Sequence, residues 1–223
     1  MAIPTALNGA VLVYDTETAE LGDRVCEIGF TIFQAGEVVM EWGTLINPTV
    51  PIDPEASNIH HIMDKDVMNM PTFADIAWLI HSNLSMADVH VAYNYTYDRG
   101  VLEKEFARVG MSYPIKPMVD PFIFFKQYNK YHKGKTLIKA AERYGIPYVG
   151  AHRAVNDATV TGKVLFRMAA TKVDFPKDIK ALVKKQRQWV ELQYNDFREY
   201  CERVKRDLPD QPNYAHYEVE AIK

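Results

Sequence analysis

The sequence predicts an α/β protein, a mixed sheet of about five strands flanked by helices, with a helical appendage at the C-terminal end. Two observations predict it: strand-like segments fill the first part of the chain, and strand and helix patterns alternate afterwards. The chain has 223 residues, 48% of them hydrophobic, which is enough to bury the core of one ordinary domain. We therefore expect a main domain over residues 1–172 and a C-terminal amphipathic helix with a polar tail over 173–223.

Three segments near the N-terminus have the composition of antiparallel strands, and a fourth strand is predicted later. The first is short, apolar and β-branched and ends at Asp15, while Ala35-Gly36 supplies a hairpin turn between the second and third. The four segments are residues 10–14, 24–34, 37–46 and 89–93. The proline-punctuated stretch over 51–71 is expected to be a loop.

Helices are predicted where apolar residues recur at spacings of three and four. One begins after Thr72, which has an acid three residues on at Asp75, as in a capping box. Others follow the strand over 89–93, ending at Gly110, and cover 136–144 and 155–170.

A long charged helix is predicted over 177–208, ending before Pro209. Its apolar stripe has two interpretations: it packs against the main domain or a second copy, or it docks a partner such as a polymerase. We favour packing because the stripe is long and continuous. Its members are Ile179, Leu182, Val183, Gln186, Val190, Phe197, Cys201, Val204 and Leu208.

Composition excludes little beyond membrane insertion. The formal net charge of −3 comes from 26 basic and 29 acidic residues, so passive phosphate binding by a basic surface is not indicated. Bound divalent cations could nevertheless invert the charge of an acidic site. Two isolated cysteines, no apolar stretch near the roughly 18 residues of a membrane span, and no expected signal peptide favour a soluble, cytoplasmic protein.

Acidic residues follow predicted strands and begin predicted helices at three places. Asp15 and Glu17 are two apart on an extended segment, so their side chains point the same way. Asp98 begins a helix, and His152 precedes Asp157 by five residues at the start of another. Taken singly, each has an ordinary structural explanation, as a solvated strand end, a helix-capping acid or a loop hydrogen-bonder.

In this order, however, the groups resemble the DEDD exonuclease superfamily, specifically its histidine-bearing branch related to the proofreading epsilon subunit of bacterial DNA polymerase III. The resemblance covers about Val11 to Ala170. Comparable segments are Arg24–Gly29, Leu45–Pro48, Ile59-His60, Val119-Asp120 and Thr136-Leu137.

The departures from the family pattern are local and leave all catalytic groups in place. Ala19-Glu20-Leu21 stands where Thr-Gly-Leu is frequent, and Tyr93-Asn94 replaces His-Asn. Tyr97 stands where Phe is common, and His61 where Gly often follows the histidine. These substitutions bear on substrate preference.

The resemblance implies a ribonuclease-H-like fold and a two-metal 3′→5′ exonuclease. Asp15, Glu17, Asp98 and Asp157 would hold two Mg²⁺ or Mn²⁺ ions. His152 would be the general base, since imidazole is largely neutral near pH 7. Residues expected to contact the nucleotide are Thr16, Leu21, Ile59, His60, Asn94 and Tyr97.

Four lysines alternate with two tyrosines over residues 126–135. This stretch could hold a single strand by charge and stacking, or it could be a solvated loop.

The expected substrate is the 3′ end of a single strand, DNA favoured, as in proofreading or repair. An RNA-trimming enzyme of the RNase T or oligoribonuclease type is the alternative. A non-catalytic nucleic-acid or polymerase adaptor is the third interpretation, which the presence of all four acids and the histidine disfavours.

Overall fold

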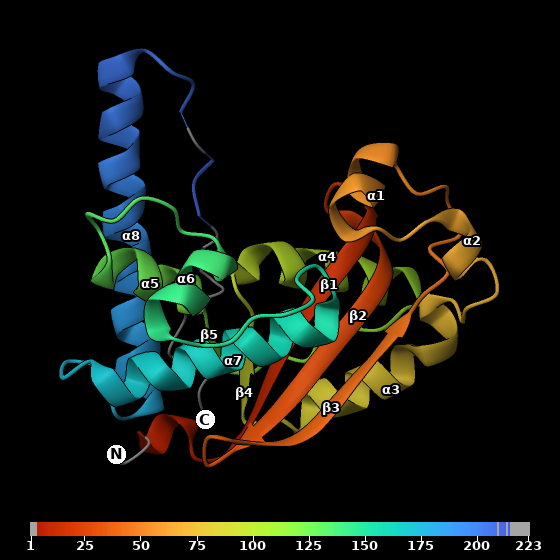
Figure 1. The fold of residues 1–223 in the computed structure, drawn as a ribbon, viewed down its shortest axis with the longest axis horizontal. Coiled ribbons are helices and arrows are strands. Elements are labelled where there is room, and N and C mark those ends of the chain that lie inside the picture. The colour runs from red at the N-terminus through yellow and green to blue at the C-terminus, as the bar shows by residue number, and fades with distance from the viewer. Residues whose placement is uncertain (1–3, 209, 213, 215–223) are drawn as a thin grey trace.

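A computed structural model describes residues 4–208, 210–212 and 214. It contains a mixed five-stranded sheet in the order β3-β2-β1-β4-β5, which confirms the predicted fold class (Figure 1). β1, β2 and β3 pair antiparallel, whereas β4 lies parallel to β1 and β5 parallel to β4. The strands are Ala10–Glu20, Asp23–Gln34, Glu37–Leu45, Val89–Val91 and Met118–Val119.

β1 continues six residues beyond the end predicted at Tyr14. The added residues are mostly polar but pair with β2 as far as Glu20 opposite Asp23, so pairing rather than composition holds them extended. A register shift between Glu17 and Thr18 marks a bulge, a feature frequent beside active sites. β1 pairs with β4 from Val11 to Val13, so among the described residues one edge of its second half has no neighbouring strand.

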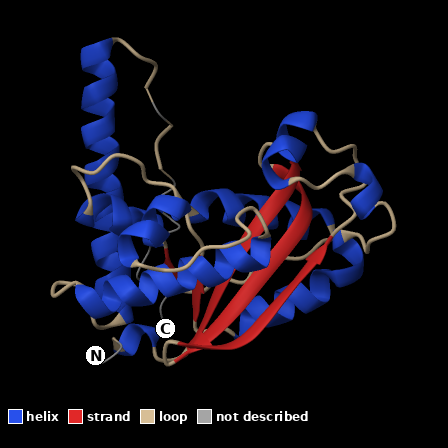
Figure 2. Cartoon of the chain, viewed as in Figure 1, coloured by secondary structure: helices blue, strands red, loops and turns tan. Residues whose placement is uncertain are grey.

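Helices cover both faces of the sheet (Figure 2). In Figure 1, α7 crosses in front of β1 and β2, and α4 lies behind them. The large buried side chains Tyr14, Phe30, Phe106 and Leu12 belong to one core cluster between these layers. The helices are α1 Pro54–His60, α2 Asp64–Val67, α3 Phe73–Met86, α4 Tyr95–Arg108, α5 Pro121–Tyr128, α6 Leu137–Tyr144, α7 Ala154–Thr171 and α8 Ile179–Val204, after a 3₁₀ turn η1 at Thr5–Leu7.

The expectation of a plain loop over 51–71 is wrong, because α1 and α2 lie in it. Asp53 caps α1, its side chain accepting the Glu55 amide at 2.8 Å, and Pro54 occupies the first turn. Proline is tolerated there because the first-turn amides have no intrahelical partner. α5 begins in the same way, with Asp120 before Pro121.

The burial of apolar side chains on α8 differs between its first and second halves. Its first half packs against α5 and β5 and buries Leu182, Val183 and Gln186, whereas Phe197 and Val204 are 43% and 46% exposed. The predicted stripe therefore packs against the main domain only in part. Pro209 and the rest of the predicted tail at 213 and 215–223 lie outside the described residues. Within the described part of the chain, no helix has the length and apolar character needed to cross a membrane.

Candidate active site

The first two acids lie on β1 where α7 crosses it. Asp15 stands opposite Gly29 on β2, and Glu17 stands opposite Glu27, so the four residues share one face of the sheet. Gly29 lets the backbone of α7 approach: a β-carbon there would lie 2.2 Å from the Val155 nitrogen. The missing side chain thus brings the N-terminal end of α7 over the two carboxylates.

Asp98 reaches β1 from the opposite layer, in the first turn of α4. One carboxylate oxygen accepts the Thr16 backbone amide at 2.9 Å and the Thr16 hydroxyl at 2.8 Å. The backbone amide is available because β4 no longer pairs with β1 at this point. Asp98 is 4% exposed, and these two bonds fix its side chain beside the strand that carries Asp15.

Asp157 lies at the start of α7 and is 8% exposed. The Tyr148 hydroxyl donates to its Oδ1 at 2.6 Å, and the His152 backbone amide donates to Oδ2 at 3.3 Å. His152 has a left-handed backbone with φ of 65°, which turns the loop back toward the helix. The hydrogen bond from the His152 backbone therefore fixes the position of the Asp157 carboxylate relative to the loop that carries His152.

Burial and the charges of nearby acids raise the pKa values of all four carboxylates. Burial, followed by the charges of Asp157 and neighbouring acids, raises the pKa of Glu17 from 4.5 to about 8. Burial also raises the pKa of Asp98 to about 7, against the lowering effect of the Thr16 hydrogen bonds. The pKa values of Asp15 and Asp157 are raised mainly by burial. Such a cluster binds protons when no cation is present, which marks it as a functional-site candidate.

The donor set suits a divalent cation. Ligand atoms of Glu17, His152 and Asp157 all lie within 4.8 Å of one another. Asp15 and Asp98 contribute further carboxylates to the same electrostatic cluster. The charge of Asp98 raises the pKa of both Glu17 and Asp15, and the charge of Glu17 also raises the pKa of Asp15. Hard carboxylate oxygens are the ligands that Mg²⁺ and Mn²⁺ take in proteins.

Sequence reasoning missed a fifth carboxylate, Glu27, and its partner Arg153. Glu27 is 4% exposed; its Oε1 accepts both the Nε and an Nη of Arg153, at 3.0 and 2.9 Å. Its Oε2 accepts the Ala154 amide at 3.3 Å. This ion pair joins β2 to the residue that follows His152. The signal was the expected antiparallel pairing of the first two strands, because an acid on β2 opposite a β1 acid must face the same side.

The predicted nucleotide-contacting residues divide into two groups. Thr16 is 5% exposed, and its hydroxyl is bonded to Asp98. His60 is 3% exposed; its Nε2 donates to the Thr18 carbonyl at 3.2 Å and its Nδ1 accepts the Ile62 amide at 3.1 Å. Both side chains are occupied with holding the end of β1 in place, and direct contact with a nucleotide stays a prediction for them.

Four other predicted residues are at least partly open to solvent. Leu21 is 93% exposed and Ile59 57%, apolar side chains at the end of β1 and on α1. Asn94 is exposed, with φ of 66°, just before α4. The Tyr97 hydroxyl bonds to Thr18 at 2.9 Å and accepts the Gly22 amide at 3.1 Å.

Comparison with known proteins assigns the domain. The family model described as exonuclease matches residues 12–165, more than half of the chain, and this range includes Asp15, Glu17, Asp98, His152 and Asp157. The chain belongs to the exonuclease family. A similar relative is the DNA polymerase III epsilon subunit of Treponema pallidum, 31% identical over 173 residues that cover 72% of this chain and 77% of the relative.

Other relatives of this exonuclease-family chain are much larger proteins. The PolC-type DNA polymerase III of Lacticaseibacillus paracasei is 27% identical over 70% of this chain but 11% of its own length. The 3′-5′ exonuclease DinG of Staphylococcus epidermidis is 27% identical over 65% of this chain and 16% of its own length. The alignments therefore span only a small part of these two relatives.

Solved structures of exonucleases have the same fold as this family member. The zinc-bound complex of E. coli exonuclease I with single-stranded DNA superposes with a TM-score of 0.70 at 17% identity, covering 81% of this chain and 43% of that one. Exonuclease X in complex with 5′-overhanging duplex DNA superposes with a TM-score of 0.60 at 22% identity, covering 72% of this chain and 92% of that one.

Proposed function

We propose that this chain is a metal-dependent 3′→5′ exonuclease that removes nucleoside 5′-monophosphates from the end of a single-stranded nucleic acid, with DNA favoured. The observation that carries the proposal is the convergence of Asp15, Glu17, Asp98 and Asp157 from β1, α4 and α7, next to His152. Family membership supports the same chemistry.

The four acids would hold two divalent cations, Mg²⁺ or Mn²⁺. Bound cations would supply activation of water and stabilisation of charge on the leaving 3′ oxygen. The raised pKa values support this role, because a cation replaces the protons that the apo carboxylates bind.

The protein's own groups would position and deprotonate the nucleophile. An imidazole nitrogen of His152 would accept a proton from the attacking water, whose oxygen bonds to phosphorus as the bond to the 3′ oxygen breaks. Thr16 and Tyr148 would keep Asp98 and Asp157 oriented through the hydrogen bonds already described. The products are a nucleoside 5′-monophosphate and a strand that ends in a new 3′ hydroxyl.

The terminal nucleotide would lie between the exposed apolar side chains and the start of α4. Leu21 and Ile59 would contact the terminal sugar and base, and Asn94 and Tyr97 the preceding nucleotide. These assignments rest on position and exposure.

DNA is favoured because the epsilon-subunit relative matches over most of its own length. A polymerase partner is part of the same proposal, since the relative's name places it in DNA polymerase III. A neighbour of the same fold is described as a 3′-exonuclease that recognises a histone mRNA stem-loop, at 13% identity, so the RNA-trimming alternative belongs in the test.

The experiment compares 5′-labelled DNA and RNA oligonucleotides in Mg²⁺ and in EDTA. We expect a ladder descending from the 3′ end in Mg²⁺ alone, faster with DNA. Asp157→Asn should abolish the ladder and leave the folded protein intact by circular dichroism. Binding without any cleavage would support the adaptor interpretation and contradict the proposal, whereas faster cleavage of RNA would reverse the substrate preference.

A further inference from the structure

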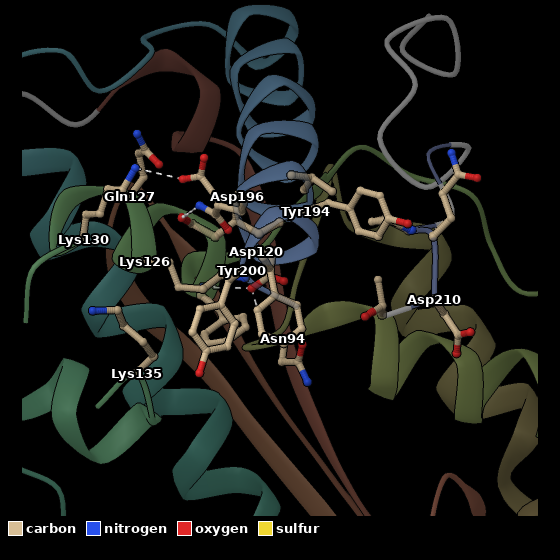
Figure 3. A pocket seen from close by; sticks show the side chains of 18 residues that line it. Asn94, Asp120, Lys126, Gln127, Lys130, Lys135, Tyr194, Asp196, Tyr200 and Asp210 are labelled. Atoms are coloured by element: carbon tan, nitrogen blue, oxygen red, sulfur yellow. Dashed lines mark hydrogen bonds and ion pairs between the residues drawn. The ribbon is translucent and has the colours of Figure 1, made fainter. Parts of the chain in front are cut away.

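A hollow of about 820 Å³ lies between α5 and α8, outside the residues that carry the candidate catalytic site (Figure 3). Its volume falls in the range of roughly 300–1,000 Å³ that is typical of ligand sites. Figure 3 shows lysine side chains from α5 and the loop after it, and polar and aromatic side chains from α8. We call it the α5–α8 hollow.

The hollow begins at the helix that carries Asp98. Asn94 and Thr96, at the start of α4, line it and are both exposed. Asp98 is two residues beyond Thr96. A strand whose 3′ end lies at the carboxylates and whose preceding nucleotide passes Asn94 would therefore continue into this hollow.

Aromatic groups on α8 form its wall. The rings of Phe197 and Tyr200 are stacked, with centroids 6.1 Å apart and planes 16° apart, and remain 43% and 44% exposed. Exposed flat rings of this kind serve as stacking platforms for the bases of single strands. The tyrosines predicted for that role are placed otherwise, since Tyr128 packs against Trp189 and Tyr131 does not line the hollow.

Cationic groups on the α5 side lie opposite those rings. Lys126, Lys130 and Lys135 line the hollow, whereas Lys133 lines a separate one beside α6. Lys126 lies over the Phe122 ring at 4.2 Å, and Lys130 pairs with Asp196 at 2.8 Å. The structure thus divides the lysine-rich stretch into three residues that face the hollow and one that does not.

Acidic groups in the hollow are mostly engaged. The Asp120 carboxylate accepts three backbone amides, those of Asn94, Tyr95 and Phe122. Asp196 is paired with Lys130, and an exposed ion pair of this kind contributes little energy, so a phosphate can replace the carboxylate as the lysine's partner. Asp210 is the third acid at the rim.

We propose that the α5–α8 hollow binds the single strand upstream of the 3′ end, with the bases on Phe197 and Tyr200 and the phosphates at Lys126, Lys130 and Lys135. The inference rests on the proposed function and extends it, since α8 lies beyond the residues 12–165 that match the exonuclease family. It predicts that long oligonucleotides bind better than short ones because of this helix.

The test measures fluorescence anisotropy of 5′-labelled oligo-dT of about 4 and about 12 nucleotides, two lengths within the usual range of site sizes. EDTA is present so that cleavage stops. Tyr200→Ala should weaken binding of the longer oligonucleotide about fivefold or more, since one stacked base is lost. Binding of the shorter one should change less. Leu192→Ala, on the same helix with 42% exposure and outside the hollow, is the matched control and should bind like wild type.

A second pair of variants tests the sign of the charge effect. Lys130→Gln should weaken binding of the longer oligonucleotide and lower the slope of log K against log salt by about 0.7, the value for one phosphate contact on a single strand. Asp196→Asn should tighten binding, because it removes a competitor for the lysine. A purely structural ion pair would make the two variants behave alike. Lys133→Gln is the control in the same loop.

The outcomes separate this inference from the proposed function. If wild type shortens the oligonucleotide in Mg²⁺ but Tyr200→Ala and Lys130→Gln bind the longer oligonucleotide unchanged, the hollow is not the strand path. If these variants lose binding while wild type never cleaves, the hollow stands and the exonuclease proposal falls. If Tyr200→Ala alters only the oligomeric mass of the protein, the hollow is an interface between copies and the inference is overturned.

Discussion

Replacing Gly29 by alanine tests the claim that close approach of α7 to β2 builds the site. The added β-carbon would lie 2.2 Å from the Val155 nitrogen and 2.4 Å from the Ala154 carbonyl carbon, whereas ordinary contacts begin near 3.4 Å. Both neighbours are backbone atoms, so no side chain can rotate away. The first turn of α7 must withdraw by about 1 Å, a forced shift of the kind that costs about 1–3 kcal/mol of folding stability.

The same shift moves two of the proposed catalytic groups. His152 precedes α7 and Asp157 lies in its first turn, so both are displaced relative to Asp15 and Glu17. A misplacement of about 1 Å can lower the rate about a hundredfold. We therefore expect Gly29→Ala to lower kcat by about that factor and to lower the melting temperature in EDTA and in Mg²⁺.

Gly100→Ala is the matched control. A β-carbon at Gly100, inside α4, would meet nothing within 4 Å. Alanine is the better helix former by about 1 kcal/mol, so this variant should keep its activity and melt at the same or a higher temperature. Thermal unfolding by circular dichroism and steady-state cleavage of a labelled oligonucleotide measure both variants. Wild-type activity and melting temperature in Gly29→Ala would refute the reasoning.

Three further predictions concern the charges of the site. Asp157→Asn should lower the cleavage rate at least a hundredfold. It should also raise the melting temperature in EDTA, because it removes one of several carboxylates that repel one another; a lower melting temperature would contradict this electrostatic account. The metal-free protein should lose stability, by a few kcal/mol at most, as pH rises from 4.5 to about 8, because folded Glu17 keeps a proton that the unfolded carboxyl releases. The affinity for Mg²⁺, measured by titration calorimetry, should rise over the same pH range. A free energy of unfolding that does not change with pH over this range in EDTA would contradict the raised pKa of Glu17. Arg153→Ala should lower the free energy of unfolding in urea by about 1–2 kcal/mol and lower kcat, because it leaves Glu27 buried without its cation. Lys139→Ala, which breaks an exposed ion pair, is the control and should lower the free energy of unfolding by less than about 0.5 kcal/mol.

The sequence was sufficient for the elements that have strong local signals. The apolar run before Asp15 and the capping box at Thr72 both predicted real elements, because hydrophobic pattern and cap chemistry act within a few residues. α1 and α5 were missed although each begins with an aspartate followed by proline, which is itself a helix-start signal. The prolines over 51–71 are typical of a loop, whereas the capping carboxylates of Asp53 and Asp120 start helices at these two places.

The candidate site was predictable as a set of residues and not as an arrangement. Order along the chain predicted Asp15, Glu17, Asp98, His152 and Asp157 as candidates. The contacts of Tyr148 and Arg153, by contrast, depend on which strands and helices meet. Tyr148 contacts Asp157 nine positions further along, across a loop and the first turn of α7, and Arg153 contacts Glu27 across 126 positions. Such contacts are long-range, and local periodicity carries no information about them.

Asp120, the aspartate before α5, forms hydrogen bonds both with the start of α4 and with α8. The Asp120 carboxylate holds the backbone at the start of α4, and its own amide donates to Gln186 of α8 at 2.7 Å. Gln186 is fully buried, and its amide group also donates to the Met118 carbonyl. Two adjoining hydrogen-bonded contacts therefore connect α8 to the base of the helix that carries Asp98, so the position of the appendage and the position of that helix are fixed by the same aspartate.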